Sequence, residues 1–350
     1  MKLESVQAVF PSRKLTNADL VELIHQHSQG TFKGDLNKAL RRIALLLKYS
    51  GAEERYWLGD NEAPVLLMST AVNKALEEAN LSKQEIDLLI YAGIDKGFTE
   101  PSQAHFVANA LGMDKVECFD ILEGCMSWSR AVKVTYAIFA EGAYKHIMIV
   151  NGEFAQTRKD GPGYPANFML RNLDQIAWTF PTYTVGEAAT ATILSRDPNR
   201  KWEFCISSSN DLVDLCTIPL EGYEGYCSLS DRIGRNGTGR FTSFGKELHE
   251  KGKPEAIKVF RELGEKVPPK NIKAIFPHTS SKTEWDDAAK KLGVKHLLYH
   301  IYPSYGNIAT ASVPAGIVLA ASGGCIKRGD RVAGWVGSSG TSFAAYSFVY

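Results

Sequence analysis

The two halves of this chain repeat one order of strands and helices. A helix end, a short loop and an apolar run occupy residues 76–91, and the same succession returns at residues 263–276. Farther along, Gly124-Cys125 has a counterpart in Gly306-Asn307, and a stretch of small residues follows each pair. A spacing that stays nearly constant over several features favours internal duplication over chance similarity between buried strands.

Repeated alternation of apolar runs and helical stretches predicts an α/β fold with parallel strand pairing. One strand is expected directly before each glycine pair, at residues 116–121 and 296–301. We therefore expect two halves about a pseudo-twofold axis, an amino-terminal half at residues 1–197 and a carboxy-terminal half at residues 198–350. The boundary is placed at a polar turn, Asp197-Pro198, which follows an apolar strand.

Cys125 lies at a predicted strand-to-helix turn, just before a helical stretch that begins near Trp128. The preceding Gly124 permits the backbone geometry of such a turn. The positive end of the helix dipole favours the thiolate, which is the nucleophilic form of cysteine. A free cysteine is more often a small buried hydrophobe, so this prediction depends on what else reaches the same place.

Two other residues are expected at the same cleft as Cys125. His278 follows the apolar run at residues 272–276, and Asn307 occupies the turn equivalent to that of Cys125. Ligands of parallel α/β sheets bind outside the carboxyl ends of the strands. Histidine titrates in the useful range, and an amide donates to an oxyanion without changing charge. A lone histidine is often structural and Gly-Asn is often only a turn, but the three together favour catalysis.

The bulk composition excludes several function classes. The 350 residues include 40 Lys plus Arg and 39 Asp plus Glu, a net charge of +1 that gives no footprint for nucleic acid. The six cysteines form no CxxC pair and histidines are not spaced among them as zinc ligands, so no metal site is predicted. The start lacks a long apolar segment, which favours a cytoplasmic protein. Residues 308–326 are interpreted as a buried small-residue helix, so no membrane span is expected.

These residues resemble the β-ketoacyl-acyl-carrier-protein synthase III group of the thiolase-like condensing enzymes. The resemblance covers nearly the whole chain, and its most specific motifs are Gly124-Cys125, Pro277-His278 and Tyr305-Gly306-Asn307. It implies a duplicated thiolase-like fold of five layers, αβαβα. It also implies a homodimer and identifies Arg55, after Ser50-Gly51, with an arginine motif near the substrate entrance.

The resemblance further implies a mechanism. Cys125 would take an acyl group from acyl-CoA or an acyl carrier protein, with the oxyanion held by N–H groups of Cys125 and a turn at Gly337 and Ser338. A malonyl thioester would then lose carbon dioxide, and the resulting enolate, stabilised by His278 Nε2 and Asn307, would attack the acyl group. No cofactor or metal is required. An acidic carrier protein would need a basic face, for which Lys258 and Arg261 are candidates, although charge runs are usually only solvated.

Several positions depart from the pattern of the family. Met126 follows the cysteine, Thr279-Ser280 follows the histidine, and Glu123 stands where a small apolar residue is common. These departures favour a specialised role in fatty acid or polyketide assembly over a housekeeping one. Glu123 either pairs with a cation such as Arg130, which we favour, or acts as a base in a step after condensation.

Other functions remain open at this point. The first alternative keeps the acyl group on Cys125 but transfers it to a hydroxyl or amine without decarboxylation. A cysteine hydrolase that uses the same residue types is a second, and a non-catalytic subunit of a larger synthase is a third. The sequence does not disclose the acyl chain, its carrier or the product.

Overall fold

The computed structural model describes residues 1–156 and 161–350, and two β-sheets form its centre. The first sheet has the order β1-β7-β6-β4-β5 and the second has the order β8-β13-β12-β11. The strands of the first are β1 (Lys2–Val9), β7 (Ala188–Ser195), β6 (His146–Glu153), β4 (Leu88–Ala92) and β5 (Glu117–Ile121). Those of the second are β8 (Glu203–Ser208), β13 (Ser342–Val349), β12 (Arg331–Ser338) and β11 (Ala274–Pro277).

The two sheets share one pattern of strand directions. In the first sheet β7 is antiparallel to both β1 and β6, whereas β4 is parallel to β6 and to β5. In the second, β13 is antiparallel to both β8 and β12, and β11 is parallel to β12. Every strand of the second sheet therefore has a counterpart in the first, as a duplicated chain requires. The first sheet lies wholly before residue 196 and the second wholly after residue 202.

The strand predicted at residues 296–301 is wrong. This segment begins with a short 3-10 turn, and only Leu298 pairs with the sheet, through a single parallel bridge to Ile275. The chain then enters α9 (Tyr302–Tyr305), in which Pro303 lies in the first turn. Proline has no N–H to donate to a strand ladder and is preorganised for a helix start, so the pairing ends after one bridge.

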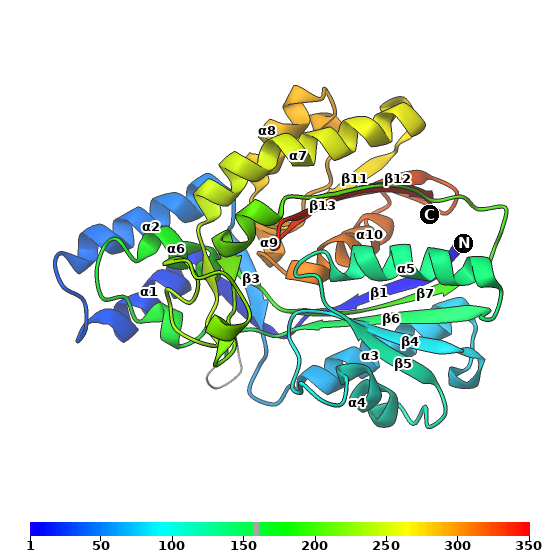
Figure 1. Ribbon diagram of the computed structural model, residues 1–350, viewed down its shortest axis with the longest axis horizontal. Coiled ribbons are helices and arrows are strands. Elements are labelled where there is room, and N and C mark those ends of the chain that lie inside the picture. The colour runs from blue at the N-terminus through cyan, green and yellow to red at the C-terminus, as the bar shows by residue number, and fades with distance from the viewer. Residues whose placement is uncertain (157–160) are drawn as a thin grey trace.

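Helices form three layers around the sheets (Figure 1). Between the sheets lie α5 (Ser127–Glu141) and α10 (Ser312–Ser322), whose side chains share one core with both sheets. The outer face of the first sheet is covered by α3 (Pro64–Ala79) and α4 (Gln103–Ala110), and that of the second by α7 (Gly245–Lys266) and α8 (Lys282–Lys291). The predicted αβαβα layers are thus confirmed.

The helix α10 is buried, as its small residues predict. A Cβ at Gly316 would lie 3.0 Å from the ring of Phe276, so the helix approaches β11 more closely than a larger residue allows. Among the described residues, no helix is long and apolar enough to cross a membrane.

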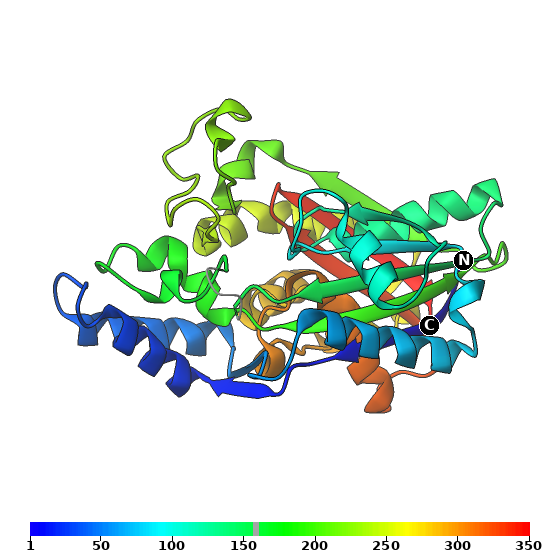
Figure 2. The same ribbon diagram turned by 90° about the horizontal axis from the view of Figure 1, so that it is seen from below.

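The remaining elements extend one end of the molecule. They are β2 (Arg13–Thr16), α1 (Asn17–Ser28), α2 (Leu36–Ser50), β3 (Glu54–Trp57), α6 (Ile176–Thr179), β9 (Cys216–Thr217) and β10 (Thr242–Ser243). Short 3-10 helices occur at Lys83–Glu85, Ala166–Phe168, Phe180–Thr184, Asn210–Leu215, Tyr223–Gly225, Pro269–Asn271, Lys295–Leu297 and Ala309–Ala311. Figure 2 shows α1 and α2 at the same end as the yellow-green loops between β8 and α7.

Candidate active site

Cys125 occupies a tight turn between β5 and α5. Gly124 has φ +52°, and the N–H groups of Met126 and Ser127 donate to the carbonyl oxygens of Glu123 and Gly124 at 3.0 and 3.1 Å. A Cβ on Gly124 would lie 2.3 Å from Ser339 Oγ, so only glycine lets this turn pack against the loop after β12. The predicted strand-to-helix turn is confirmed, with Cys125 two residues before the first residue of α5.

The predicted thiolate, however, is wrong for the resting protein. Burial raises the pKa of the Cys125 thiol well above its ordinary value, and Cys216 and Glu153 act in the same direction. The amino terminus of α5 does lie at Cys125, but the cost of removing water from a charged sulfur outweighs its field. The raised pKa therefore favours a neutral Cys125 thiol in the resting protein.

His278 is fixed at the carboxyl end of β11. Its backbone N–H donates to the carbonyl oxygen of Trp335 at 2.9 Å, and the residue is buried. Burial lowers the pKa of the His278 imidazole to about 3, with a smaller contribution from the charge of His249. The ring is therefore neutral near pH 7, which leaves one ring nitrogen as a donor and the other as an acceptor.

Ser312 determines which nitrogen carries the proton. Ser312 Oγ lies 2.5 Å from the carbonyl oxygen of Ala309, a distance that two oxygens reach only with a proton between them. Ser312 thus donates to Ala309 and has only lone pairs for His278 Nδ1, which lies 3.1 Å away. With the Ser312 proton on Ala309, a proton on Nδ1 is the arrangement that gives His278 and Ser312 a hydrogen bond, and it leaves Nε2 as an acceptor. The expected role of His278 Nε2 at an enolate stays a prediction.

Asn307 lies where two loops cross. Its backbone N–H donates to the carbonyl oxygen of Thr184 at 2.7 Å, and its carbonyl oxygen accepts from the N–H of Gly186 at 3.0 Å. A Cβ on Gly186 would come 2.0 Å from the carbonyl oxygen of Tyr305, so the crossing requires glycine there. Asn307 Oδ1 accepts from the N–H of Ala309 at 3.0 Å. That bond turns the amide so that its NH₂ remains available as a donor.

The structure brings Cys125 and Asn307 to one cavity of about 60 Å³. His278 is not among the residues that line it, and Cys125 and His278 make no direct hydrogen bond within the described part of the chain. They are linked through the segment between Asn307 and α10, in which Thr310 Oγ1 donates to the carbonyl oxygen of Gly124 at 3.1 Å. Catalytic hydrogen bonds are often long before substrate binds, so this separation is compatible with a joint role.

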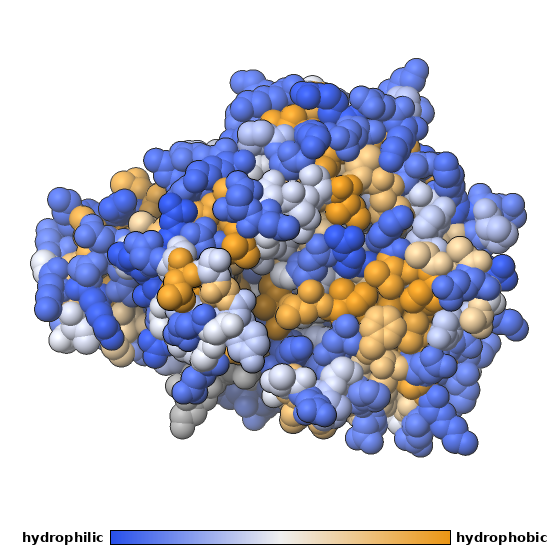
Figure 3. Space-filling view, viewed as in Figure 1, coloured by the Kyte–Doolittle hydropathy of each residue, from blue (hydrophilic) through white to orange (hydrophobic). Residues whose placement is uncertain are grey.

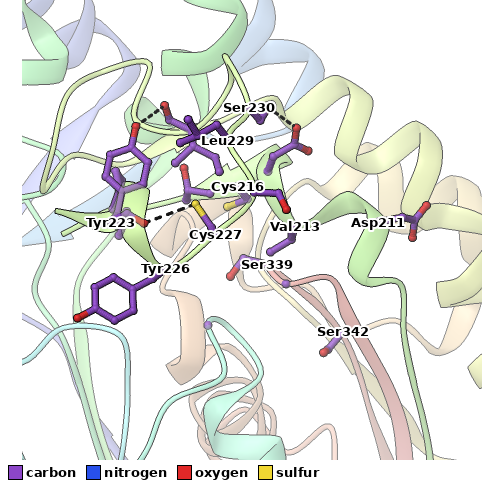
Figure 4. A pocket seen from close by; sticks show the side chains of 18 of the residues that line it. Asp211, Val213, Cys216, Tyr223, Tyr226, Cys227, Leu229, Ser230, Ser339 and Ser342 are labelled. Atoms are coloured by element: carbon purple, nitrogen blue, oxygen red, sulfur yellow. Dashed lines mark hydrogen bonds between the residues drawn. The ribbon is translucent and has the colours of Figure 1, made fainter. Parts of the chain in front are cut away.

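A larger cavity of about 760 Å³ also adjoins the turn that carries Cys125. Its lining includes Glu123, Gly124 and Ser339 from the turn, and Cys216 and Cys227 from the loops between β8 and α7. Figure 4 shows Cys216, Cys227 and Ser339 toward the centre of this cavity. Sequence reasoning did not connect these loops with the site, because their residues carry no periodic pattern that places them beside Cys125.

Two further predictions concern residues near the turn that carries Cys125. Glu123 forms a salt bridge with Arg130, and Arg130 Nη2 donates to Glu123 Oε1 at 2.9 Å. The favoured pairing of Glu123 with Arg130 is confirmed. Gly337 and Ser338 are the last residues of β12 and pair with β13, so the predicted turn begins one residue later, at Ser339. Ser338 Oγ nevertheless donates to the carbonyl oxygen of Glu123 at 2.8 Å.

The remaining predicted residues lie away from both cavities. Arg55 is fully buried and donates through Nη1 to Asn17 Oδ1 at 2.9 Å, so it lines no entrance in the described structure. Lys258 and Arg261 are exposed on α7, where Lys258 pairs with Glu255 at 2.8 Å. A docking role for these two residues stays a prediction.

Comparisons with known proteins agree with this architecture. Residues 264–350 match the family described as 3-oxoacyl-[acyl-carrier-protein] synthase III C terminal. The β-ketoacyl-[acyl-carrier-protein] synthase III of Aquifex aeolicus is 24% identical over 336 residues, covering 95% of this chain and 93% of that protein. The corresponding protein of Rhizobium rhizogenes is 24% identical over 337 residues, covering 93% and 91%.

The chain is similar over nearly its whole length to β-ketoacyl-acyl-carrier-protein synthase III proteins. Its fold matches the solved Aquifex aeolicus 3-oxoacyl-[acyl-carrier-protein] synthase III with a TM-score of 0.79 at 22% identity, over 100% of this chain and 99% of that one. A variant of Xanthomonas campestris OleA with bound lauric acid and lauroyl-CoA gives a TM-score of 0.81 at 19% identity, over 99% and 98%. The chain thus has the thiolase-like duplicated fold of these two structures over nearly its whole length.

Proposed function

We propose that the protein is an acyl-thioester condensing enzyme that forms β-ketoacyl thioesters. The observation that carries the proposal is the shared cavity, which is lined both by Cys125, near a helix amino terminus, and by Asn307. Similarity to β-ketoacyl-acyl-carrier-protein synthase III proteins supports the same reaction class. The acyl donor would be acyl-CoA or an acyl carrier protein, and the second substrate a malonyl-type thioester.

In the first step Cys125 Sγ attacks the thioester carbonyl. Its proton moves to His278 Nε2 once substrate binding brings the two together, because Nε2 is the free acceptor of the neutral ring. The backbone N–H of Cys125, which has no backbone partner among the described residues, donates to the oxyanion. The carbon–sulfur bond to the carrier breaks, and the departing thiolate takes the proton from His278.

In the second step the malonyl group loses carbon dioxide, and the electron pair of the broken bond forms an enolate. The NH₂ group of Asn307 donates to the enolate oxygen, since its Oδ1 is held by Ala309. The enolate carbon attacks the acyl carbonyl and expels Cys125 as a thiolate. A proton from solvent, delivered through His278, restores the thiol. The pathway is proposed to be a specialised branch of fatty acid or polyketide assembly.

Release of carbon dioxide distinguishes condensation from the main alternative. The acyl-loaded enzyme would be incubated with malonyl-CoA labelled in the free carboxyl group, and labelled carbon dioxide collected. We expect release that depends on acyl loading and falls in Asn307→Ala, because the enolate then loses its donor. Acyl transfer to a hydroxyl or amine acceptor without labelled carbon dioxide would instead establish an acyltransferase, and free acid as the main product a hydrolase.

We also propose a homodimer joined along β5. This strand is the edge of the first sheet, and Leu122, directly after it, has an exposed side chain, as does Phe98, which stacks on Phe106 of α4. Figure 3 shows an apolar band on the face that carries β5 and α5. Unpaired edges and large apolar patches mark association surfaces. Light scattering should give a dimer for the native chain and a monomer for Leu122→Glu; a monomeric native chain would overturn this proposal.

A further inference from the structure

The cavity beside Cys125 has a polar wall that the proposed mechanism does not use. Glu153, the last residue of β6, and Asp95, three residues after β4, both line it although each is buried, with exposed fractions of 4% and 8%. Because β4 and β6 are parallel neighbours, their carboxyl ends place both side chains at the same edge of the sheet. The presence of two buried carboxyl groups needs a chemical explanation, because burial disfavours the charged form of a carboxylate.

Glu153 is held as a neutral acid. The backbone N–H of Ile94 donates to Oε1 at 3.1 Å, and that of Asp95 approaches Oε2 at 3.4 Å. Burial, and then repulsion from Asp95, raises the pKa of the Glu153 carboxyl to about 8. The raised pKa favours the protonated form of Glu153, which can act as a hydrogen-bond donor, although a side-chain hydrogen bond with Thr310 opposes the shift.

Gln156 supplies an unpaired acceptor on the same wall. Its Nε2 donates to the carbonyl oxygen of Thr182 at 3.0 Å, which fixes the orientation of the amide. Its Oε1 is buried and has no hydrogen-bond partner among the described residues. An unpaired buried acceptor costs about 1–3 kcal/mol, so a ligand group that donates to it is favoured.

We propose that this wall is a specificity subsite for short acyl groups that carry a hydroxyl near the thioester, held between Glu153 as donor and Gln156 Oε1 as acceptor. A hydroxyl provides one proton and two lone pairs and so satisfies both groups at once. The 60 Å³ volume admits only a few heavy atoms, which places the hydroxyl close to the carbonyl bound at Cys125. The inference rests on the proposed function, because the acyl group must reach Cys125.

The test compares acyl groups that differ in one position. Rates of Cys125 acylation would be measured by intact mass for β-hydroxybutyryl-CoA, for isovaleryl-CoA, in which a methyl group replaces the hydroxyl, and for butyryl-CoA. We expect the hydroxylated donor to react at least about tenfold faster than isovaleryl-CoA, since a site built to bond a hydroxyl rejects an analogue that lacks it. Gln156→Met should bring the ratio of these two rates toward one.

Two further variants make the result specific. Glu153→Gln retains an N–H donor and should keep most of the preference, whereas Glu153→Met should lose it. Gln26→Met, the same substitution as in Gln156→Met but on the exposed face of α1, should leave the ratio as in the native protein. Equal rates for the hydroxylated and methylated donors, or an unchanged ratio in Gln156→Met, would overturn the subsite alone. Failure of all three donors to load Cys125 would overturn the proposed function with it.

Discussion

His278 Nδ1 lies 3.1 Å from Ser312 Oγ, whose own proton is committed to the carbonyl oxygen of Ala309. The histidine therefore donates from Nδ1 and presents an unprotonated Nε2. Ser312 acts through His278 and not on the substrate, so it is a positioning residue. Its position at the start of α10 couples the tautomer of His278 to the same segment that carries Asn307.

Ser312→Ala should slow acylation of Cys125. Without the hydroxyl, Nδ1 has no fixed acceptor, and the ring populates the tautomer that cannot take the thiol proton at Nε2. We expect the acylation rate at saturating donor to fall roughly tenfold to a hundredfold, with little change in KM, because proton transfer contributes on that scale. Ser322→Ala, the same change at the exposed end of α10, serves as the matched control. A change confined to KM would contradict the positioning role.

The pH dependence of Cys125 alkylation tests its protonation state. Because burial raises the pKa of this thiol, the reactive thiolate becomes more abundant with each pH unit up to a value well above the ordinary 9.0. The rate of iodoacetamide labelling, followed by peptide mapping, should therefore still rise at pH 9, where a free model thiol begins to level off. A labelling rate that is already constant at or below neutral pH would show a preformed Cys125 thiolate. It would contradict a neutral thiol in the resting protein.

Gly124→Ala should abolish acylation. The added methyl would meet Ser339 Oγ at 2.3 Å and Ser338 Oγ at 2.6 Å, and a left-handed φ disfavours alanine as well. Gly112→Ala separates the two causes, because Gly112 has φ +67° and nothing within 4 Å of its Cβ position. Acylation by Gly112→Ala should stay near native while Gly124→Ala loses at least about a hundredfold. Equal activity in the two variants would contradict the need for close packing at the turn.

Glu123 and Arg130 should behave as a structural pair. Glu123→Gln and Arg130→Gln each remove the same partly exposed salt bridge, which is worth at most about 1 kcal/mol. Both variants should load acyl groups at similar rates and give the same products, as judged by intact mass and product analysis. A later step that stops in Glu123→Gln but continues in Arg130→Gln would instead establish Glu123 as a base.

The fold was largely predictable because the duplication and the apolar periodicity can both be recognised in the sequence. The alignment of Cys125 with Asn307, and of His278 with a strand end, depends only on local order and spacing. The failed strand at residues 296–301 has an apolar pattern, but Pro303 and α9 end its pairing after one bridge. An apolar pattern alone does not predict how many residues of a segment pair with the sheet.

The electrostatics of the site were not predictable in the same way. A cysteine at a helix amino terminus suggests a thiolate, yet its protonation depends on how much protein surrounds the sulfur, which only the fold reveals. Glu153 and Gln156 were missed because the end of β6 and the residues after it carry no recognisable motif. Ser312 was visible within the Ala311-Ser312-Val313-Pro314 segment, but its contact with His278 spans 34 residues of chain.

The account depends most on Cys125 as the residue that receives the acyl group. The native protein would be incubated with short acyl-CoA donors, and the modified residue located by intact mass and peptide mapping. We predict a single acyl adduct on Cys125, no adduct in Cys125→Ala, and native-like loading in Cys216→Ala. An adduct that persists in Cys125→Ala, or one that maps to Cys216, would contradict the central claim.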